Sequence, residues 1–304
     1  MKLGYDGPLH ILAFDHRGSF QKKFFGVQGE PTQEETATIA DAKKVIYEGM
    51  LAALEKDPDP VLRDAAGVLV DEQFGTDIAR DARKRGIMLA MPVEKSGQDE
   101  FDFQYGNEFD AHILDFSPTF SKVLVRYNPE ADGVMNQRQT EKLKRLGDWL
   151  HANDRSFLFE LLVPAEAHQL ETVGGDTGRY DRELRAELML TAIAELQQAG
   201  VEPDIWKIEG LDDREDCERI SEQCRTGGRD GVVCVVLGRG ADDAAVDQWL
   251  KTASGVSGYV GFAIGRSIWW DPLKEYVGGS FAREAAADRI GENYLRFLSI
   301  YRAG

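Results

Sequence analysis

The chain is organised around the segment Asp204-Ile205-Trp206-Lys207-Ile208-Glu209-Gly210, which places a lysine inside a short apolar run. Isoleucine and tryptophan favour β-strands, so the segment is typical of a buried strand. A charged side chain is rarely buried without a partner or a function. A neutral amine in a pocket is what Schiff-base chemistry requires. Taken alone, the segment favours the simpler interpretation, in which Lys207 pairs with Glu209 or another acid.

Seven further apolar segments have the composition of buried strands. They are Leu9–Phe14, Gly67–Val70, Ile87–Met91, Lys122–Tyr127, Phe157–Val163, Val232–Leu237 and Tyr259–Ile264. Helical patterns separate them, at about Glu34–Lys56 with a Thr32/Glu35 capping box, Gln137–Asn153, Ala241–Thr252 and Phe281–Ile300. Eight strands alternating with helices predict a parallel sheet covered on both faces. We therefore predict an α/β protein, a (β/α)8 TIM barrel forming a single domain over residues 1–304.

An open, doubly wound sheet is the alternative, but no Gly-x-Gly-x-x-Gly turn follows the first strand. Three connections are less regular. A polar loop is expected after Gly18, and a short helix capped by Thr76 or Asp77 is expected to end near Gly86. A loop is also expected between the fifth strand and Tyr180.

Composition excludes several classes of function. The net charge of −17 argues against nucleic acid or an anionic membrane as partner. No apolar run is long enough to span a membrane and the N-terminus has no signal-peptide core, so a cytoplasmic location is predicted. The three cysteines (Cys217, Cys224 and Cys234) lack metal-ligand spacing and are predicted to be core thiols. The sequence predicts no metal and no cofactor.

In such barrels the chemistry lies at the carboxyl ends of the strands. Those positions hold the charged residues Asp15, Arg17, Asp71, Glu72, Glu94, Lys95, Arg126, Glu160, Lys207, Glu209, Arg239 and Arg266. Each could be a solvated charge or a salt bridge. Together they converge on one mouth only if the barrel forms.

The last two strand ends form one predicted subsite. They supply Gly238, Gly240, Gly265 and Arg266, and the segment at Ser267 is expected to start a short helix. Glycine amides, a helix N-terminus and an arginine together suit a phosphate. The simpler interpretation is that the glycines only make tight turns.

Lys207 and Glu160 form the second predicted subsite. Neighbouring strands lie about 4.8 Å apart, so residues at matching heights can touch. Burial and the nearby Lys95 or Lys122 would keep the Lys207 amine partly neutral, so that it attacks a ketone while Glu160 moves protons. A buried ion pair with a purely structural role is the alternative.

The order of short motifs along nearly the whole chain resembles a known family. The motifs are Phe14-Asp15-His16-Arg17, Glu94-Lys95-Ser96-Gly97, Lys122, Phe159-Glu160, Trp206-Lys207-Ile208-Glu209, and Gly265-Arg266 with Trp269. They resemble the class I tagatose-1,6-bisphosphate and sulfofructosephosphate aldolase group. The resemblance is greater still to the aldolase-like domain fused to the inositol-catabolism kinase 5-dehydro-2-deoxygluconokinase.

The resemblance implies that Lys207 forms the imine and that Glu160 is the acid/base. It implies cleavage of 2-deoxy-5-keto-gluconate 6-phosphate to dihydroxyacetone phosphate and malonate semialdehyde. The candidate phosphate-binding residues are Gly238, Arg239, Gly240, Gly265 and Arg266. The candidate substrate-binding residues are Asp15, Arg17, Lys95, Lys122, Arg126 and Glu209, of which Arg17, Lys95 and Arg126 would hold the far carboxylate or hydroxyls. The turn Leu237-Gly238-Arg239-Gly240 departs from the small Ser-Ala-Gly pattern of the tagatose enzymes.

Three alternatives stay open from the sequence. The substrate could be another ketose phosphate or bisphosphate, such as tagatose 1,6-bisphosphate, or a sulfo-sugar phosphate, 6-deoxy-6-sulfofructose 1-phosphate. A metal-assisted lyase or isomerase could use Asp71, Glu72, Glu160 and Glu209 as ligands. A barrel without catalysis could bind a sugar phosphate and signal. The expected partner is a small phosphorylated molecule, and Trp269, Trp270 and Tyr276 could meet a second copy of the chain.

Overall fold

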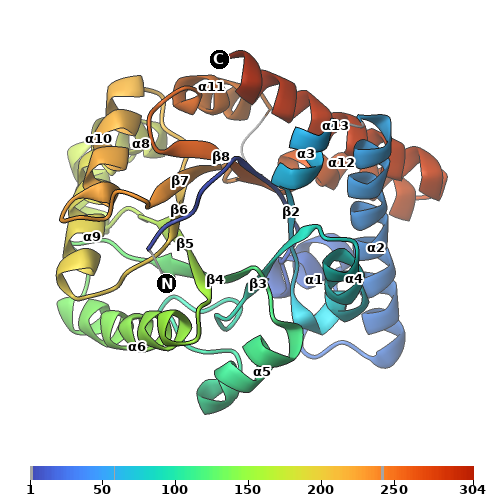
Figure 1. The fold of residues 1–304 in the computed structure, drawn as a ribbon, viewed down its shortest axis with the longest axis horizontal. Coiled ribbons are helices and arrows are strands. Elements are labelled where there is room, and N and C mark those ends of the chain that lie inside the picture. Colours follow the sequence, from blue (N-terminus) through green and yellow to red (C-terminus); the bar gives the residue numbers. More distant parts are fainter. Residues whose placement is uncertain (1–2, 58, 241–242) are drawn as a thin grey trace.

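The protein is a closed barrel of parallel strands. The computed structural model describes residues 3–57, 59–240 and 243–304. In this part of the chain eight strands pair in sequence order, and β8 pairs with β1 to close the ring (Figure 1). The strands are β1 (Leu9–Ala13), β2 (Ala66–Leu69), β3 (Met88–Pro92), β4 (Phe120–Arg126), β5 (Ser156–Leu162), β6 (Ile205–Glu209), β7 (Val233–Leu237) and β8 (Tyr259–Ile264). The predicted (β/α)8 fold is confirmed.

Helices surround the barrel (Figure 1). They are α1 (Gly18–Phe25), α2 (Gln33–Lys56), α3 (Pro60–Ala65), α4 (Glu72–Lys84), η1 (Gly106–Glu108), α5 (Phe109–Phe116), α6 (Gly133–Ala152), α7 (Ala167–Thr172), α8 (Thr177–Glu183), α9 (Arg185–Gln198), α10 (Arg214–Arg225), α11 (Asp243–Ala253), α12 (Arg266–Val277) and α13 (Arg283–Ala303). The capping box predicted at Thr32 and Glu35 is present. The predicted start of a helix at Ala241 lies outside the described residues.

Three connections differ from the sequence-based expectation. Helix α1 occupies the predicted polar loop after Gly18. Helix α4 starts at Glu72, because the Asp71 carboxylate accepts the Phe74 N–H at 2.9 Å and caps it. The predicted cap at Thr76 or Asp77 is wrong, because both residues lie inside α4, just after a kink at Gly75, whose dihedrals are non-helical. The predicted loop before Tyr180 contains α7 and the start of α8, and Asp176 caps the latter.

Two apolar layers position the site. The lumen holds a cluster of small and branched side chains that includes Ile205, Leu158 and Val235, whereas Trp206 belongs to the layer between strands and helices. Because strand side chains alternate, Lys207 and Glu209 share the inward parity of Ile205. The apolar lumen therefore gives way to polar side chains at the carboxyl end of the barrel.

Other predictions concern the cysteines and the membrane. The three cysteines are buried free thiols, with the Cys224 and Cys234 sulfurs 3.7 Å apart, so they are core thiols as predicted. Within the described residues, no helix is both long and apolar enough to cross a bilayer.

Candidate active site

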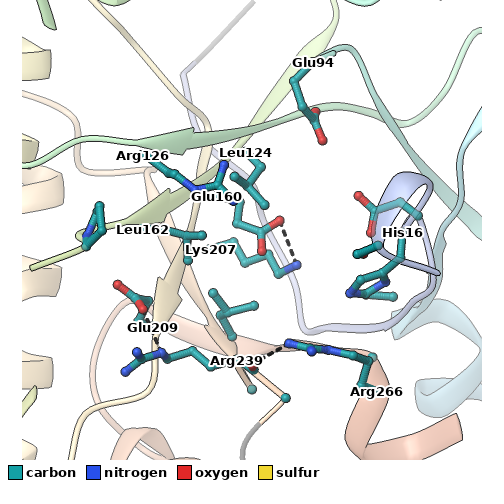
Figure 2. A pocket seen from close by; sticks show the side chains of 18 of the residues that line it. His16, Glu94, Leu124, Arg126, Glu160, Leu162, Lys207, Glu209, Arg239 and Arg266 are labelled. Carbon is teal, nitrogen blue, oxygen red and sulfur yellow. Dashed lines mark hydrogen bonds and ion pairs between the residues drawn. The ribbon is translucent and has the colours of Figure 1, made fainter. Parts of the chain in front are cut away.

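A cavity of about 510 Å³ opens at the carboxyl ends of the strands. The predicted site residues all line it. They are Asp15, Arg17, Lys95, Lys122, Arg126, Glu160, Lys207, Glu209, Gly238, Arg239, Gly240, Gly265 and Arg266. In Figure 2 the labelled side chains among them, those of Arg126, Glu160, Lys207, Glu209, Arg239 and Arg266, surround one space. The barrel topology thus brings together charges that lie far apart in the sequence.

Lys207 and Glu160 lie side by side in this cavity. They are register partners on β6 and β5, and the Lys207 Nζ is 3.0 Å from Glu160 Oε2 (Figure 2). Their side chains are only 3% and 7% exposed. The expected contact at matching strand heights is therefore present. Both side chains reach the cavity, so the pair is accessible to a small molecule.

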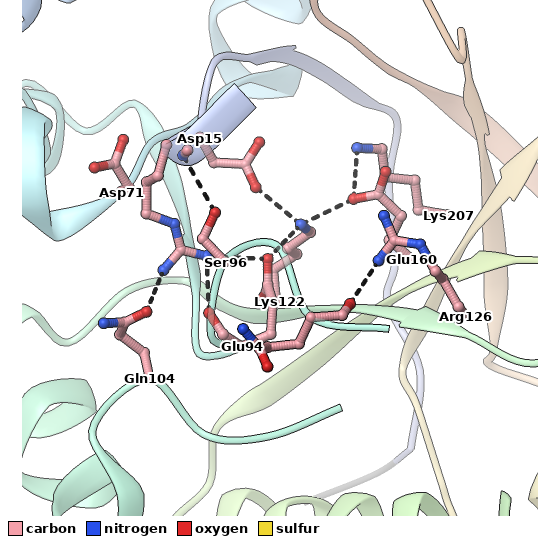
Figure 3. Close-up of polar contacts among 12 residues, drawn as sticks. Asp15, Asp71, Glu94, Ser96, Gln104, Lys122, Arg126, Glu160 and Lys207 are labelled. Atoms are coloured by element: carbon pink, nitrogen blue, oxygen red, sulfur yellow. Dashed lines mark hydrogen bonds and ion pairs between the residues drawn. The ribbon is translucent and has the colours of Figure 1, made fainter. Parts of the chain in front are cut away.

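Lys122 of β4 connects the acids of the site. Its ammonium is 2.8 Å from Asp15, 2.9 Å from Glu94 and 2.9 Å from Glu160 (Figure 3). Burial lowers the pKa of Lys122, but the three carboxylates raise it by more, so the net shift is upward. Lys122 is thus a fixed positive charge between three acids.

The three acids respond differently to this charge. Burial raises the pKa of Asp15 and Glu160, but Lys122 and Lys207, joined by His16 at Asp15, together lower it by more and hold both values below the ordinary range. Glu94 keeps a raised pKa, because burial exceeds the effect of Lys122 and Arg17. Glu160 is therefore an ionised carboxylate able to accept a proton from its neighbour.

The basic candidates divide into engaged and available groups. Arg17 is 7% exposed and donates to the Glu94 carbonyl at 2.8 Å and to Gln104 at 3.2 Å. Arg126 donates to the Gln98 carbonyl at 2.9 Å and remains partly exposed. Lys95 lines the cavity and is exposed. Arg126 and Lys95 can contact a ligand, whereas the hydrogen bonds of Arg17 mainly stabilise the loop after β3.

The loops after β7 and β8 form the predicted phosphate subsite. Gly265 follows β8 as the N-cap of α12, and Arg266 is the first residue of this helix, whose N-terminus carries a partial positive charge. A Cβ at Gly265 would overlap the Ala13 carbonyl, and one at Gly240 would overlap the Arg266 guanidinium. The backbone contact at Ala13 requires glycine at position 265, whereas glycine at position 240 leaves room for the Arg266 guanidinium to lie across the turn.

Arg239 lies in a network of acids. Its Nε is 3.0 Å from Glu209, its Nη1 is 2.7 Å from Asp181, and its carbonyl accepts Arg266 Nη2 at 2.7 Å. Glu209 also accepts the Val163 N–H at 2.9 Å. Burial raises the pKa of Glu209 to about 7, against the opposing effect of Arg185. The site therefore contains an acid that titrates near neutrality.

Two residues at the site had no predicted role. Glu94 bridges Lys122 and Arg17, and His16 lines the cavity with its ring 5.7 Å from Trp269. Burial lowers the pKa of His16 to about 4, so the imidazole is neutral at neutral pH. His16 follows β1 and Glu94 follows β3. Their place after the carboxyl ends of strands was the signal in the sequence that could have indicated a role at the site.

The four acids proposed as metal ligands are scattered. Asp71 pairs with the buried Lys43, and Glu72 pairs with His112 at 2.9 Å. Glu160 and Glu209 contact different cations in the cavity. Among the described residues, no three His, Cys, Asp or Glu side chains are grouped to hold a metal ion. The geometry does not assemble that ligand set.

Comparisons with known proteins agree with this fold. A family model described as "Uncharacterized protein conserved in bacteria (DUF2090)" matches residues 5–304. Tagatose 1,6-diphosphate aldolase 2 from Streptococcus pyogenes serotypes M1 and M18 is 26% identical over 169 residues, which are 53% of this chain and 47% of each relative. The chain thus spans about half the length of these curated relatives.

Solved structures show the same barrel. An archaeal fructose 1,6-bisphosphate aldolase superposes with a TM-score of 0.59 at 15% identity, covering 98% of this chain and 95% of the other. Cgl0159 from Corynebacterium glutamicum superposes with a TM-score of 0.55 at 19% identity, covering 97% and 88%. At these identities the likeness establishes the fold alone.

Proposed function

The chain belongs to the bacterial family described as DUF2090, and we propose that its cavity is the active site of a class I aldolase acting on a phosphorylated keto sugar or keto acid. One observation carries the proposal: the buried Lys207 amine is 3.0 Å from the Glu160 carboxylate and opens into a cavity of about 510 Å³. The partial likeness to tagatose 1,6-diphosphate aldolases supports it.

The pair is suited to forming an imine. Glu160 accepts a proton from the Lys207 ammonium, and the freed nitrogen attacks the carbonyl carbon of the substrate. A proton passes from the attacking nitrogen to the oxygen to give a carbinolamine, whose hydroxyl then takes the proton held by Glu160 and leaves as water, so that a protonated imine remains. Lys122, which cannot easily lose its charge between three acids, supports the oxygen as negative charge develops on it.

The imine then allows the carbon–carbon bond to break. The electrons of that bond move to the imine nitrogen and give an enamine, while the hydroxyl of the departing carbon loses its proton to Glu160 and becomes an aldehyde. The aldehyde leaves, the enamine carbon takes up a proton, and water releases the ketone from Lys207. Glu160 therefore serves alternately as base and acid beside one nitrogen.

Cationic groups at two ends of the cavity suit a substrate with two anionic ends. Arg266 and the N-terminus of α12 suit a phosphate. Arg126 and Lys95 lie on the β3–β4 side of the cavity and suit a second anion, a carboxylate or another phosphate. Our leading substrate is 2-deoxy-5-keto-gluconate 6-phosphate, cleaved to dihydroxyacetone phosphate and malonate semialdehyde. Tagatose 1,6-bisphosphate and 6-deoxy-6-sulfofructose 1-phosphate are the competing substrates.

Reductive trapping tests the proposal. The protein is incubated with each of the three substrates, treated with borohydride and digested for peptide mass mapping. We expect substrate-dependent inactivation, with the added mass on the peptide that carries Lys207. Lys207→Met should abolish labelling, whereas Lys144→Met, at an exposed ion pair of α6, should label normally. Full turnover by Lys207→Met, or labelling at a different lysine, would contradict the proposal.

A further inference from the structure

Arg239 occupies an unusual backbone position at the end of β7. Its φ is 49°, in the left-handed region that glycine adopts at little cost and other residues rarely adopt. The next residue, Gly240, also has a positive φ, of 70°. A glycine at position 239 would fit this turn with less strain. The arginine side chain therefore needs a reason to be there.

The contacts of that side chain supply the reason. Nε is 3.0 Å from Glu209, which stands two residues after Lys207 on β6, and Nη1 is 2.7 Å from Asp181 of α8. Glu209 is 5% exposed and is fixed by the Val163 N–H, so the arginine has a rigid anchor. Glu209 and Asp181 occupy N–H groups of the guanidinium, which leaves fewer of them for an anion.

The backbone of the same residue holds the neighbouring arginine. The Arg239 carbonyl accepts Arg266 Nη2 at 2.7 Å, and the Arg266 guanidinium lies against Gly240, where a Cβ would overlap it (Figure 2). No other hydrogen bond of that guanidinium is made to the described residues. As far as residues 3–57, 59–240 and 243–304 show, its remaining N–H groups are open to a ligand, in a direction set by the Arg239 carbonyl.

We propose that Arg239 is a positioning residue, which Glu209 and Asp181 hold in place so that its carbonyl aims the Arg266 guanidinium at an anionic group of the substrate. This inference rests on the proposed function, and it replaces the sequence-based assignment of Arg239 as a phosphate ligand and of Glu209 as a substrate ligand. Glu209, Arg239 and Arg266 then link the strand of Lys207 to the phosphate subsite.

A double-mutant cycle tests this role. Glycerol 3-phosphate is the probe, because it carries a phosphate but no carbonyl and cannot form an imine. Its affinity is measured by calorimetry for wild type, Arg239→Gly, Arg266→Ala and the double variant. Arg239→Gly removes the side chain without backbone strain, and its melting temperature shows whether the fold is kept. Arg80→Ala, which breaks the exposed Arg80–Asp115 pair on α4, is the matched control.

If Arg239 acts through Arg266, Arg239→Gly should weaken binding about tenfold and should have no further effect once Arg266 is alanine. Glu209→Gln should weaken binding in the same way, and Arg80→Ala should bind as wild type. Additive losses in the double variant would make Arg239 a direct ligand and overturn the inference alone. Unchanged affinity in Arg239→Gly would also overturn it alone. Failure of the wild type to bind the probe would overturn both the inference and the proposed phosphate subsite.

Discussion

Replacement of Lys122 by methionine should destabilise the protein in a pH-dependent way. Lys122 contacts Asp15, Glu94 and Glu160 at 2.8–2.9 Å, and the four side chains are at most 10% exposed. Without the ammonium, three buried carboxylates face one another with Lys207 and Arg17 as their nearby cations. Breaking a buried ion pair by removing one partner costs about 3–5 kcal/mol, so we expect a loss of at least that size at pH 8.

The sign of the pH dependence follows from the same contacts. In wild type the pKa values of Asp15 and Glu160 lie below the ordinary range, so these acids stabilise the fold above their unfolded pKa values. In Lys122→Met the loss of the cation and mutual repulsion raise the carboxylate pKa values above those of the unfolded chain. The native state then binds more protons than the unfolded state, so the stability of the variant rises as the pH falls from 8 towards 5.

Urea unfolding at pH 5 and pH 8 measures both effects. The control is Lys43→Met, because Lys43 is equally buried but pairs with one carboxylate, that of Asp71. We expect the stability difference between Lys122→Met and wild type to shrink at pH 5 by more than the corresponding difference for Lys43→Met. A loss below about 1 kcal/mol at pH 8, or an equal loss at both pH values, would refute the view that Lys122 compensates three ionised acids.

Three further predictions concern single residues. Glu160→Gln should lower kcat about 10²–10⁴-fold while the substrate still binds. Steady-state kinetics measures kcat, and the affinity for glycerol 3-phosphate shows whether binding is kept. An unchanged kcat would count against the proton-transfer role of Glu160. Glu209 faces Arg185, Asp181, Glu160 and Arg239, and its pKa is raised to about 7. Its ionisation should therefore lower the free energy of unfolding by on the order of 3 kcal/mol as the pH rises from about 4.5 to 7. Urea unfolding of Glu209→Gln should show a correspondingly weaker fall, and parallel curves for the two proteins would contradict this. Gly240→Ala should weaken glycerol 3-phosphate binding by displacing Arg266, whereas Gly279→Ala, at a similar φ of 80° but in open space, should cost stability without affecting affinity; equal affinities in the two variants would argue against Arg266 as a ligand.

The barrel was predictable because the strands are strongly apolar and regularly spaced. The same regularity placed Lys207 and Glu160 at matching heights on neighbouring strands, and the register of β5 and β6 confirms that placement. The helix α4 was harder, because its cap Asp71 directly follows a strand and Gly75 interrupts the helical dihedrals. Local composition shows a break there but not that the helix continues across it.

The partners of the charged residues could not be predicted in the same way. The sequence shows Lys122 opening a strand, but its three carboxylates come from β5 and from the segments that follow β1 and β3, so only the closed barrel brings them together. Arg239 stands beside two glycines, and this composition suggests a phosphate turn. Its ion pair with Asp181 depends on α8, a helix in a glycine-rich stretch, and its ion pair with Glu209 depends on the pairing of β6 with β7.

The charges of the cavity also explain how a chain with a net charge of −17 could accept an anionic substrate. At physiological ionic strength, charges further away than about 8 Å are largely screened, so the groups that line the cavity determine the electrostatic attraction of a ligand. In formal charges, the buried contacts combine three acids, Asp15, Glu94 and Glu160, with three cations, Arg17, Lys122 and Lys207. This centre is nearly neutral, and it offers a ligand hydrogen bonds but little net attraction. The attraction therefore falls to Arg266 on one side and to Arg126 and Lys95 on the other, so the cavity should favour molecules with an uncharged carbon chain and charged ends.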